Sequence, residues 1–348
     1  MELQSYSNQS HNTINTDEEY VEQNNSLKIL PYSEKNSAIW DEFLVSTPMA
    51  TFLHTRRYLS YHADRFQDVS LMIKDEKNRL VGLFPAAIDP SNSKRVVSHP
   101  GITYGGLLHT GNLRGANMIE AFKALRDYYA NHGFESLRYK VVPNIYHQVP
   151  AADDLYALFR IGAVRYRCDL SCAIDLLNRP ISTKRRRRGL EKALKYGVQI
   201  KEGVEFVKDF WKLLEDNLAR KIGALPVHSL NEIIYLYSMF PNNIEFVVGL
   251  YEHEVVAGIV LFSGPKVLRA QYIGSSQLGN QICALDLLFE HCLKKAQLQS
   301  AHYFDFGTSN QNEGQDLKAS LYQFKSEFGG GGVVQEFYEI PLIGQEVI

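Results

Sequence analysis

The stretch Tyr272-Ile273-Gly274-Ser275-Ser276-Gln277-Leu278-Gly279-Asn280-Gln281 decides the fold, because an apolar run leads through small residues into a helical pattern. The segment 267–273 before it predicts a strand, and 284–296 after it carries apolar residues at helical spacing. The segment 301–306 predicts a further strand. This order of strand, loop, helix and strand indicates a crossover within an α/β sheet.

The same order of elements occurs in the front half of the chain. Leu80-Val81-Gly82 corresponds to Val256-Ala257-Gly258, and Tyr104-Gly105-Gly106 corresponds to Ile273-Gly274-Ser275. Because hairpins precede both crossovers, we predict two copies of one α/β (α+β) unit, each a mixed, mainly antiparallel sheet flanked by helices. The expected front strands are 27–30, 68–73, 80–88, 96–104 and 135–142, with helices at 38–45, 55–66 and 116–130; the expected back strands are 244–251, 255–262, 267–273 and 301–306, with helices at 204–219 and 284–296.

Length and composition agree with two packed domains. The chain has 348 residues, of which 45% are hydrophobic, and this content excludes a disordered chain. The net charge of -2 excludes a surface that binds polyanions over its whole area, but it allows a local basic patch. We predict a disordered tail at 1–26, a first domain at 27–164, a second domain at 165–340 and a short tail at 341–348.

Several absences bear on the compartment. Residues 1–26 lack the basic start and the apolar block of a signal peptide, and charged residues interrupt the apolar stretch 244–262, so we expect no membrane span and a cytoplasmic location. The four cysteines have the spacing of neither a zinc site nor a disulfide framework. We interpret them as small buried hydrophobes, and we expect no metal.

The loop at 273–280 offers a first candidate for chemistry. Its small residues allow close approach of a ligand, and backbone N–H groups at a helix start can bind a phosphate such as the pyrophosphate of coenzyme A. The alternative is an ordinary strand-to-helix turn, which glycine and serine also favour. No sequence signature of an ATPase loop, a dinucleotide site, a zinc protease or a serine hydrolase is present. The candidate cofactor-binding residues are Ile273, Gly274, Ser275, Ser276, Gly279 and Asn280.

A second candidate follows the last predicted strand. Asp305 and Phe306 end that strand, a polar loop follows, and a short helix delivers Phe324 and Lys325 just before a run of four glycines. A lysine at this place could stabilise a negatively charged oxygen as it develops. The alternative is a solvated helix residue.

These segments together resemble the Fem-type (FemABX) branch of the GNAT acyltransferase superfamily, close to uncharacterised acyltransferases of bacterial surface-polysaccharide clusters. The resemblance is strongest over about 165–340 and looser over 27–164. It implies two tandem GNAT-like domains and transfer of an acyl or aminoacyl group to an amine. The segments that carry it are 184–197, Tyr272-Ile273-Gly274-Ser275-Ser276, Phe304-Asp305-Phe306-Gly307, Phe324-Lys325 and Phe328-Gly329-Gly330.

The resemblance also implies roles for individual residues. Phe324 and Lys325 match the pair that contacts the acyl carbonyl, with the lysine stabilising the tetrahedral intermediate, and Tyr272 matches an aromatic residue near the acceptor. Two departures concern the donor: Leu317-Lys318 stands where relatives often have Leu-Asn, and the long helical hairpin that grips aminoacyl-tRNA in some members is not evident.

We therefore favour acyl-CoA as donor and an amine of a cell-envelope precursor, such as an amino sugar or a peptide in small-molecule or lipid-linked form, as acceptor. One alternative is a transferase that uses aminoacyl-tRNA. Another is a GNAT relative without catalysis that binds a sugar nucleotide or a partner protein.

The base that takes the amine proton has three candidates, Asp305, His99 and His228, because each lies on or beside an expected loop or strand end. Acceptor binding is assigned to cations and rings near expected loops of the first domain, namely His54, Arg57, Tyr104, Lys140 and Tyr146.

A basic run, Lys184-Arg185-Arg186-Arg187-Arg188, lies between the two copies. Ser182 or Thr183 can cap the helix that it begins. The overall charge balance and the lack of an RNA-binding motif argue against general nucleic-acid binding, and no DNA partner is expected. Arg185 is a candidate for binding a phosphate of the acceptor or donor, and a solvated helix start is the alternative.

Overall fold

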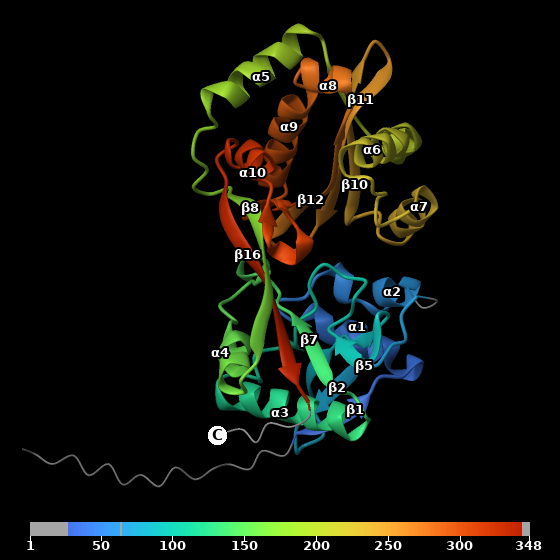
Figure 1. The fold of residues 1–348 in the computed structure, drawn as a ribbon, viewed down its shortest axis with the longest axis vertical. Helices are drawn as coiled ribbons and strands as arrows, with labels where there is room; N and C mark the ends of the chain where they lie inside the picture. The colour runs from blue at the N-terminus through green and yellow to red at the C-terminus, as the bar shows by residue number, and fades with distance from the viewer. Residues whose placement is uncertain (1–26, 63–64, 343–348) are drawn as a thin grey trace, which may run out of the picture.

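The computed structural model describes residues 27–62 and 65–342, and these form two lobes stacked along the long axis of the molecule (Figure 1). The predicted tail 1–26 lies outside the described residues. Two long strands, β8 (Val164–Asp175) and β16 (Gly331–Pro341), run through both lobes.

The strands of the first lobe belong to two sheets, a four-stranded sheet of its own and one end of a larger sheet that continues into the second lobe. The remaining elements of this lobe are β1 (Lys28–Pro31), α1 (Ser37–Val45), α2 (Arg56–Leu59), β2 (Leu71–Lys74), β3 (Leu80–Phe84), β4 (Ala87–Asp89), β5 (Asn92–Val97), β6 (Leu108–His109), α3 (Ala116–Asn131), β7 (Ser136–Lys140) and α4 (Asp153–Arg160).

The second lobe has helices on both sides of its sheet. Its elements are α5 (Lys184–Lys195), β9 (Gln199–Glu202), α6 (Val207–Ile222), α7 (Leu230–Met239), β10 (Ile244–Tyr251), β11 (Glu254–Ser263), β12 (Val267–Ser275), α8 (Gln277–Gln281), α9 (Ala284–Leu298), β13 (Tyr303–Thr308), β14 (Asn310–Gln311), β15 (Asp316–Leu317) and α10 (Ala319–Ser326).

One ten-stranded sheet joins the lobes, in the order β4-β5-β7-β16-β8-β13-β12-β11-β10-β9. Strand β5 pairs in parallel with β7, and β12 pairs in parallel with β13, while every other ladder of this sheet is antiparallel. Helix α3 connects the first parallel pair and α9 connects the second. The expected fold class, two mixed and mainly antiparallel units with the same crossover, is therefore confirmed.

The C-terminal strand departs from the expected division of the chain. Strand β16 lies between β7 of the first lobe and β8, and it pairs with both. Pro341 ends β16, and the Leu342 N–H bonds to the Glu135 carbonyl at 3.0 Å, so these two residues belong to the sheet and not to a tail. The division at 164/165 remains a proposal.

Three expected elements of the first lobe are wrong in their bounds, and the backbone explains the first two. The strand expected at 80–88 is two strands in different sheets, because Pro85 has no N–H to donate to a ladder. The strand expected at 96–104 ends at Val97, since His99 takes a positive φ of 53°. The helix expected at 55–66 is short, with α2 starting after the capping side chain of Thr55.

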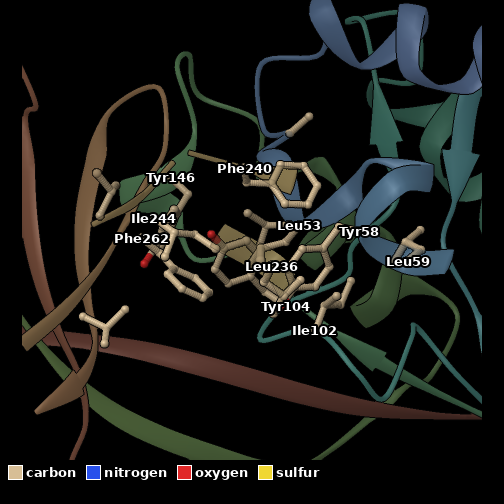
Figure 2. Packing of buried hydrophobic residues seen from close by; sticks show 14 of the residues in the cluster. Leu53, Tyr58, Leu59, Ile102, Tyr104, Tyr146, Leu236, Phe240, Ile244 and Phe262 are labelled. Carbon is tan, nitrogen blue, oxygen red and sulfur yellow. The ribbon is translucent and has the colours of Figure 1, made fainter. Parts of the chain in front are cut away.

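The two lobes share a hydrophobic core. Figure 2 shows Leu53, Tyr58 and Tyr104 of the first lobe packed near Phe240 and Phe262 of the second. A second core lies between α9 and the sheet of the second lobe, and a third lies under α3 and α4. Of the four free cysteines, Cys172 and Cys292 are buried as expected, while Cys168 and Cys283 are half-buried.

Candidate active site

The candidate site lies where strands β12 and β13 separate. The two strands pair only as far as Arg269 and Asp305, although β12 continues to Ser275 and β13 to Thr308. A bulge at Gln271 interrupts the ladder between β12 and β11. Beyond Arg269 and Asp305, β12 and β13 no longer pair with each other. The backbone groups along these facing edges are therefore available to other partners.

A cavity of about 780 Å³, which we call the splay cavity, occupies this opening. It is large enough for a small-molecule ligand. Seven of the residues proposed from the sequence line it together, namely Tyr272, Ile273, Gly274, Ser275, Asn280, Phe324 and Lys325.

Lys325 lies in the last turn of α10 and is only 3% exposed, so it is not a solvated helix residue. Its Nζ donates to the carbonyl of Gly307 at 2.9 Å and to the carbonyl of Thr308 at 2.7 Å. These bonds use two of its three N–H donors. Burial lowers the pKa of Lys325 to about 8, with Asp305 opposing the shift, so the side chain is mainly a cation at pH 7.

Asp305 holds the loop that binds Lys325. Its Oδ1 accepts hydrogen bonds from Ser171 Oγ at 2.6 Å and from the Gly307 N–H at 2.8 Å, and its Oδ2 accepts from Tyr146 and from Arg269. Burial by itself raises the pKa of Asp305, but the Arg269 guanidinium and these donors bring it below its usual value. A saturated carboxylate of low pKa is a weak proton acceptor, so its geometry fits a positioning role.

His228 and Tyr272 form a pair at the edge of the splay cavity. The Tyr272 hydroxyl accepts the His228 backbone N–H at 3.3 Å and also bonds to His228 Nδ1. The Trp211 ring packs edge-on against Tyr272, with centroids 5.0 Å apart. Burial lowers the pKa of His228 to about 4, so its imidazole is neutral at pH 7, and burial raises the pKa of Tyr272.

The small residues of the 273–280 loop serve packing and capping. A Cβ at Gly279 would lie 2.2 Å from the Val256 carbonyl oxygen, and a Cβ at Gly274 would lie 3.1 Å from atoms of Phe210 on α6. The Gly279 N–H already donates to Ser276 Oγ at 3.0 Å. This amide is therefore not free for a phosphate, and α8 is only five residues long.

A second cavity of about 390 Å³, the α5 cavity, lies between α5 and the start of α9. Arg185, Arg188 and Lys192 are exposed, line this cavity and share one face of α5. Arg186 is buried beneath them and pairs with Asp286 at 3.1 Å. This cavity adjoins the splay cavity, because three residues line both, namely Asn280, Leu285 and Phe324.

Three of the proposed acceptor residues belong to the core between the lobes. His54, Tyr104 and Tyr146 are 0%, 2% and 4% exposed, and Figure 2 shows Tyr104 and Tyr146 within the packed cluster. Their rings contact one another, with Tyr104 and Tyr146 centroids 4.5 Å apart. Their burial makes them part of the interface that holds the lobes together, and none of them lines the splay cavity or the α5 cavity.

The other proposed residues lie elsewhere. Arg57 is exposed, with its guanidinium 5.3 Å from the centre of the Phe240 ring. His99 is 2% exposed, and burial holds its pKa well below the usual value. Lys140 lines a third cavity of about 390 Å³, the junction cavity, on the sheet between the lobes.

Sequence reasoning missed Arg269, which lines the splay cavity and pairs with Asp305. A signal was present, because an arginine inside the apolar strand Val267–Ser275 is rarely buried without a partner. Asn217 was missed as well. It lines the splay cavity and donates to the Ser275 carbonyl at 2.9 Å, while its buried Oδ1 finds no partner within 27–62 and 65–342.

Comparison with solved structures identifies the fold. The chain superposes on the crystal structure of FemX with a TM-score of 0.64 and 10% sequence identity, covering 90% of this chain and 97% of FemX. This is the Fem-type GNAT-like fold. By sequence, no family model and no curated protein matches the chain.

Two further structures share the Fem-type fold. The C-terminal domain of a putative lysylphosphatidylglycerol synthetase from Agrobacterium fabrum matches with a TM-score of 0.58 and 10% identity, over 88% of this chain and 92% of that domain. The L-PGS of Bacillus licheniformis matches with a TM-score of 0.55 and 13% identity, over 78% of this chain and 83% of that chain.

Two searches of the described residues concern metals and membranes. Within 27–62 and 65–342, no cluster of three or more His, Cys, Asp or Glu side chains has the geometry to hold a metal ion. No described helix combines the length and the apolar character needed to cross a bilayer.

Proposed function

We propose that this protein is an N-acyltransferase of the Fem type, which moves an acyl group from acyl-CoA onto an amine of a cell-envelope precursor. The observation that carries this proposal is the buried cation of Lys325, which lines the splay cavity with one N–H left to donate. The fold shared with FemX and with lysylphosphatidylglycerol synthetase supports transfer to an envelope component.

The reaction assigned to the splay cavity is direct attack of an amine on a thioester carbonyl. A C–N bond forms, the carbonyl oxygen becomes an oxyanion, the C–S bond then breaks, and the thiolate of CoA leaves. Lys325 stabilises the oxyanion, and Phe324 on the same helix packs against the acyl group. Because the lysine acts as a cation, it forms no covalent bond to the substrate.

The proton of the amine goes to the pair formed by Tyr272 and His228. Of the three base candidates, His228 combines an imidazole that is neutral at pH 7 with a bond to the hydroxyl of Tyr272, which lines the cavity. A base of lowered pKa suffices, because the attacking nitrogen becomes strongly acidic once it is bonded to the carbonyl carbon. Asp305 is instead saturated with donors, and His99 is buried away from the cavity.

The α5 cavity supplies the cations that a CoA donor needs. Arg185, Arg188 and Lys192 line it, and among the described residues the one ion pair they form is that of Arg185 with Glu327 at 3.6 Å, since the lining carboxylate Asp286 pairs with Arg186. The shared wall at Phe324 allows a donor to place its phosphates against α5 and its acyl group in the splay cavity. Cys283, which is half-buried, also lines the α5 cavity.

Transfer from aminoacyl-tRNA is a second candidate, and the exposed cationic face of α5 favours it. Arg185, Arg188, Lys192 and Lys195 follow one another at helical spacing and continue beyond the cavity, as a nucleic-acid backbone requires. The third candidate is a protein that binds a sugar nucleotide or a partner protein and catalyses no reaction.

The test is mass spectrometry of reaction products. The purified protein is mixed with acetyl-CoA, longer acyl-CoAs or charged tRNA, each against a panel of UDP- and dTDP-linked amino sugars. We expect an acylated amine and free CoA, and a loss of about 10²–10³ in turnover for Lys325→Met. Lys294→Met, which changes an exposed lysine of α9, is the matched control.

Each outcome separates the candidates. Product formation that ribonuclease abolishes identifies the tRNA-dependent transferase. Full activity of Lys325→Met removes the lysine from the mechanism, and failure of every donor with every amine leaves the protein as a binding module.

A further inference from the structure

The junction cavity lies on the face of the ten-stranded sheet where one lobe meets the other. Strands β7, β16 and β8 are neighbours there (Figure 1). Alternate residues of each strand project to one face. The cavity is accordingly lined by pairs two residues apart, namely Arg138 and Lys140 on β7, Gln335 and Phe337 on β16, and Arg167 and Asp169 on β8.

The lining has more cations than its carboxylates can neutralise. Asp169 pairs with Arg167 at 2.6 Å. Asp89, at the edge of the cavity, pairs with Arg95 at 2.8 Å outside it. Arg138 is left with a carboxylate only at 3.7 Å, and Lys140 bonds to a neutral carbonyl, that of Ile102. The remaining lining carboxylate, Glu313, is exposed.

Two of these cations, Arg138 and Lys140, are held in place by neutral groups. Arg138 Nε is buried and has no hydrogen-bond partner among the described residues, and the guanidinium lies over the Tyr166 ring, 4.3 Å from its centre. Such a group gains a strong charge-assisted bond when an oxyanion enters. Burial, with Arg167 adding to the effect, lowers the pKa of Lys140 to about 7, and a bound anion would restore its charged form.

The junction cavity also adjoins the splay cavity. Arg269 and Thr308 line both, and the Thr308 carbonyl is one of the two that hold Lys325. A molecule anchored in the junction cavity can therefore reach the place where Lys325 acts without entering the α5 cavity, which is lined by none of the same residues.

We propose that the junction cavity binds an oxyanion, a phosphate or a carboxylate, of the amine acceptor through Arg138, Arg167 and Lys140. The oxyanion site follows from the cavity itself, while its assignment to the acceptor rests on the proposed function. Donor and acceptor would then approach Lys325 through separate cavities, each guided by its own set of cations.

The test is isothermal titration calorimetry at low ionic strength with two probes, inorganic pyrophosphate and succinate. We expect saturable binding of at least one probe, about tenfold weaker in Arg138→Gln and in Arg167→Gln. Pyrophosphate as the ligand indicates a phosphorylated acceptor, and succinate indicates a carboxylate. Lys294→Gln controls for net charge, and Lys140→Met is a second variant whose length matches the native side chain. Melting curves check that each variant is folded.

Binding that survives in Arg138→Gln, Arg167→Gln and Lys140→Met, or that is lost only in Arg188→Gln of the α5 cavity, overturns the proposal, as does the absence of saturable binding. If the probe binds as expected but no amine is acylated, the oxyanion site stands and the proposed function fails. If acylation occurs and Arg138→Gln leaves the acceptor KM unchanged, the proposed function stands and the assignment of the junction cavity to the acceptor fails.

Discussion

Tyr146 donates a hydrogen bond of 2.7 Å to Asp305 and so ties the first lobe to the loop that holds Lys325. The same carboxylate accepts the Gly307 N–H, and the Gly307 carbonyl accepts from Lys325. The position of the cation thus depends on contacts from both lobes. The core between the lobes therefore has a second role, because it fixes this hydrogen-bonded chain as well as the packing (Figure 2).

Tyr146→Phe tests this connection. The variant removes one buried hydrogen bond to a carboxylate, so the free energy of unfolding should fall by about 1–3 kcal/mol. Turnover should also fall, since the loop around Gly307 loses a support. Chemical denaturation and steady-state kinetics measure the two effects. Tyr235→Phe, at a tyrosine that is 55% exposed, should change neither, and an equal loss in both variants would contradict the role assigned to Tyr146.

Asp305→Asn tests the charge at the centre of the same network. The Arg269 side chain is only 14% exposed, and in this variant it would lose the carboxylate that neutralises it. We therefore expect a loss of roughly 3–5 kcal/mol in the free energy of unfolding. Adding Arg269→Met should recover part of it, because the second change removes the unpaired charge. Urea titration measures the free energy of unfolding of each single variant and of the double variant. If the loss in the double variant equals the sum of the losses in the single variants, the two residues are not coupled.

The pKa of Lys325 predicts a dependence of stability on pH. The folded value of about 8 lies below the ordinary value of 10.5, so between these limits the unfolded chain binds more protons than the folded one. Stability relative to Lys325→Met should therefore rise with pH from 8 to 10.5, by roughly 3 kcal/mol in total. Catalysis should change the opposite way, falling above pH 8 as the cation is lost. A flat difference in stability across this range would refute the lowered pKa.

Gly279→Ala separates packing from phosphate binding at the 273–280 loop. The added methyl group would meet the Val256 carbonyl at 2.2 Å, so the free energy of unfolding should fall by about 1–3 kcal/mol in the absence of any ligand. Gly331→Ala, where no atom lies within 4 Å, is the matched control. If Gly279→Ala is as stable as the native protein but binds the donor more weakly, the glycine serves ligand binding and not packing.

The sequence predicted most of the second lobe, because its signals are local. Strands β10 and β11 have the expected bounds to within two residues, and Thr183 caps α5 as one of the two expected candidates. In the first lobe, Pro85 and the left-handed backbone at His99 cut two expected strands short, and apolar periodicity does not report either effect. The prediction that the domain boundary falls at 164/165 is still open, since β16 belongs to both lobes.

The sequence by itself predicted the repeated strand–helix–strand unit and the candidate pair Phe324 and Lys325. Both predictions rest on hydrophobic periodicity and small-residue loops, which are properties of residues close together in the chain. The tertiary structure decided which polar residues face a cavity. His54, Tyr104 and Tyr146 became core when the second lobe packed on them, and Arg269 became part of the site when β12 and β13 separated. Burial depends on contacts between residues far apart in the chain, and no single stretch of sequence contains them.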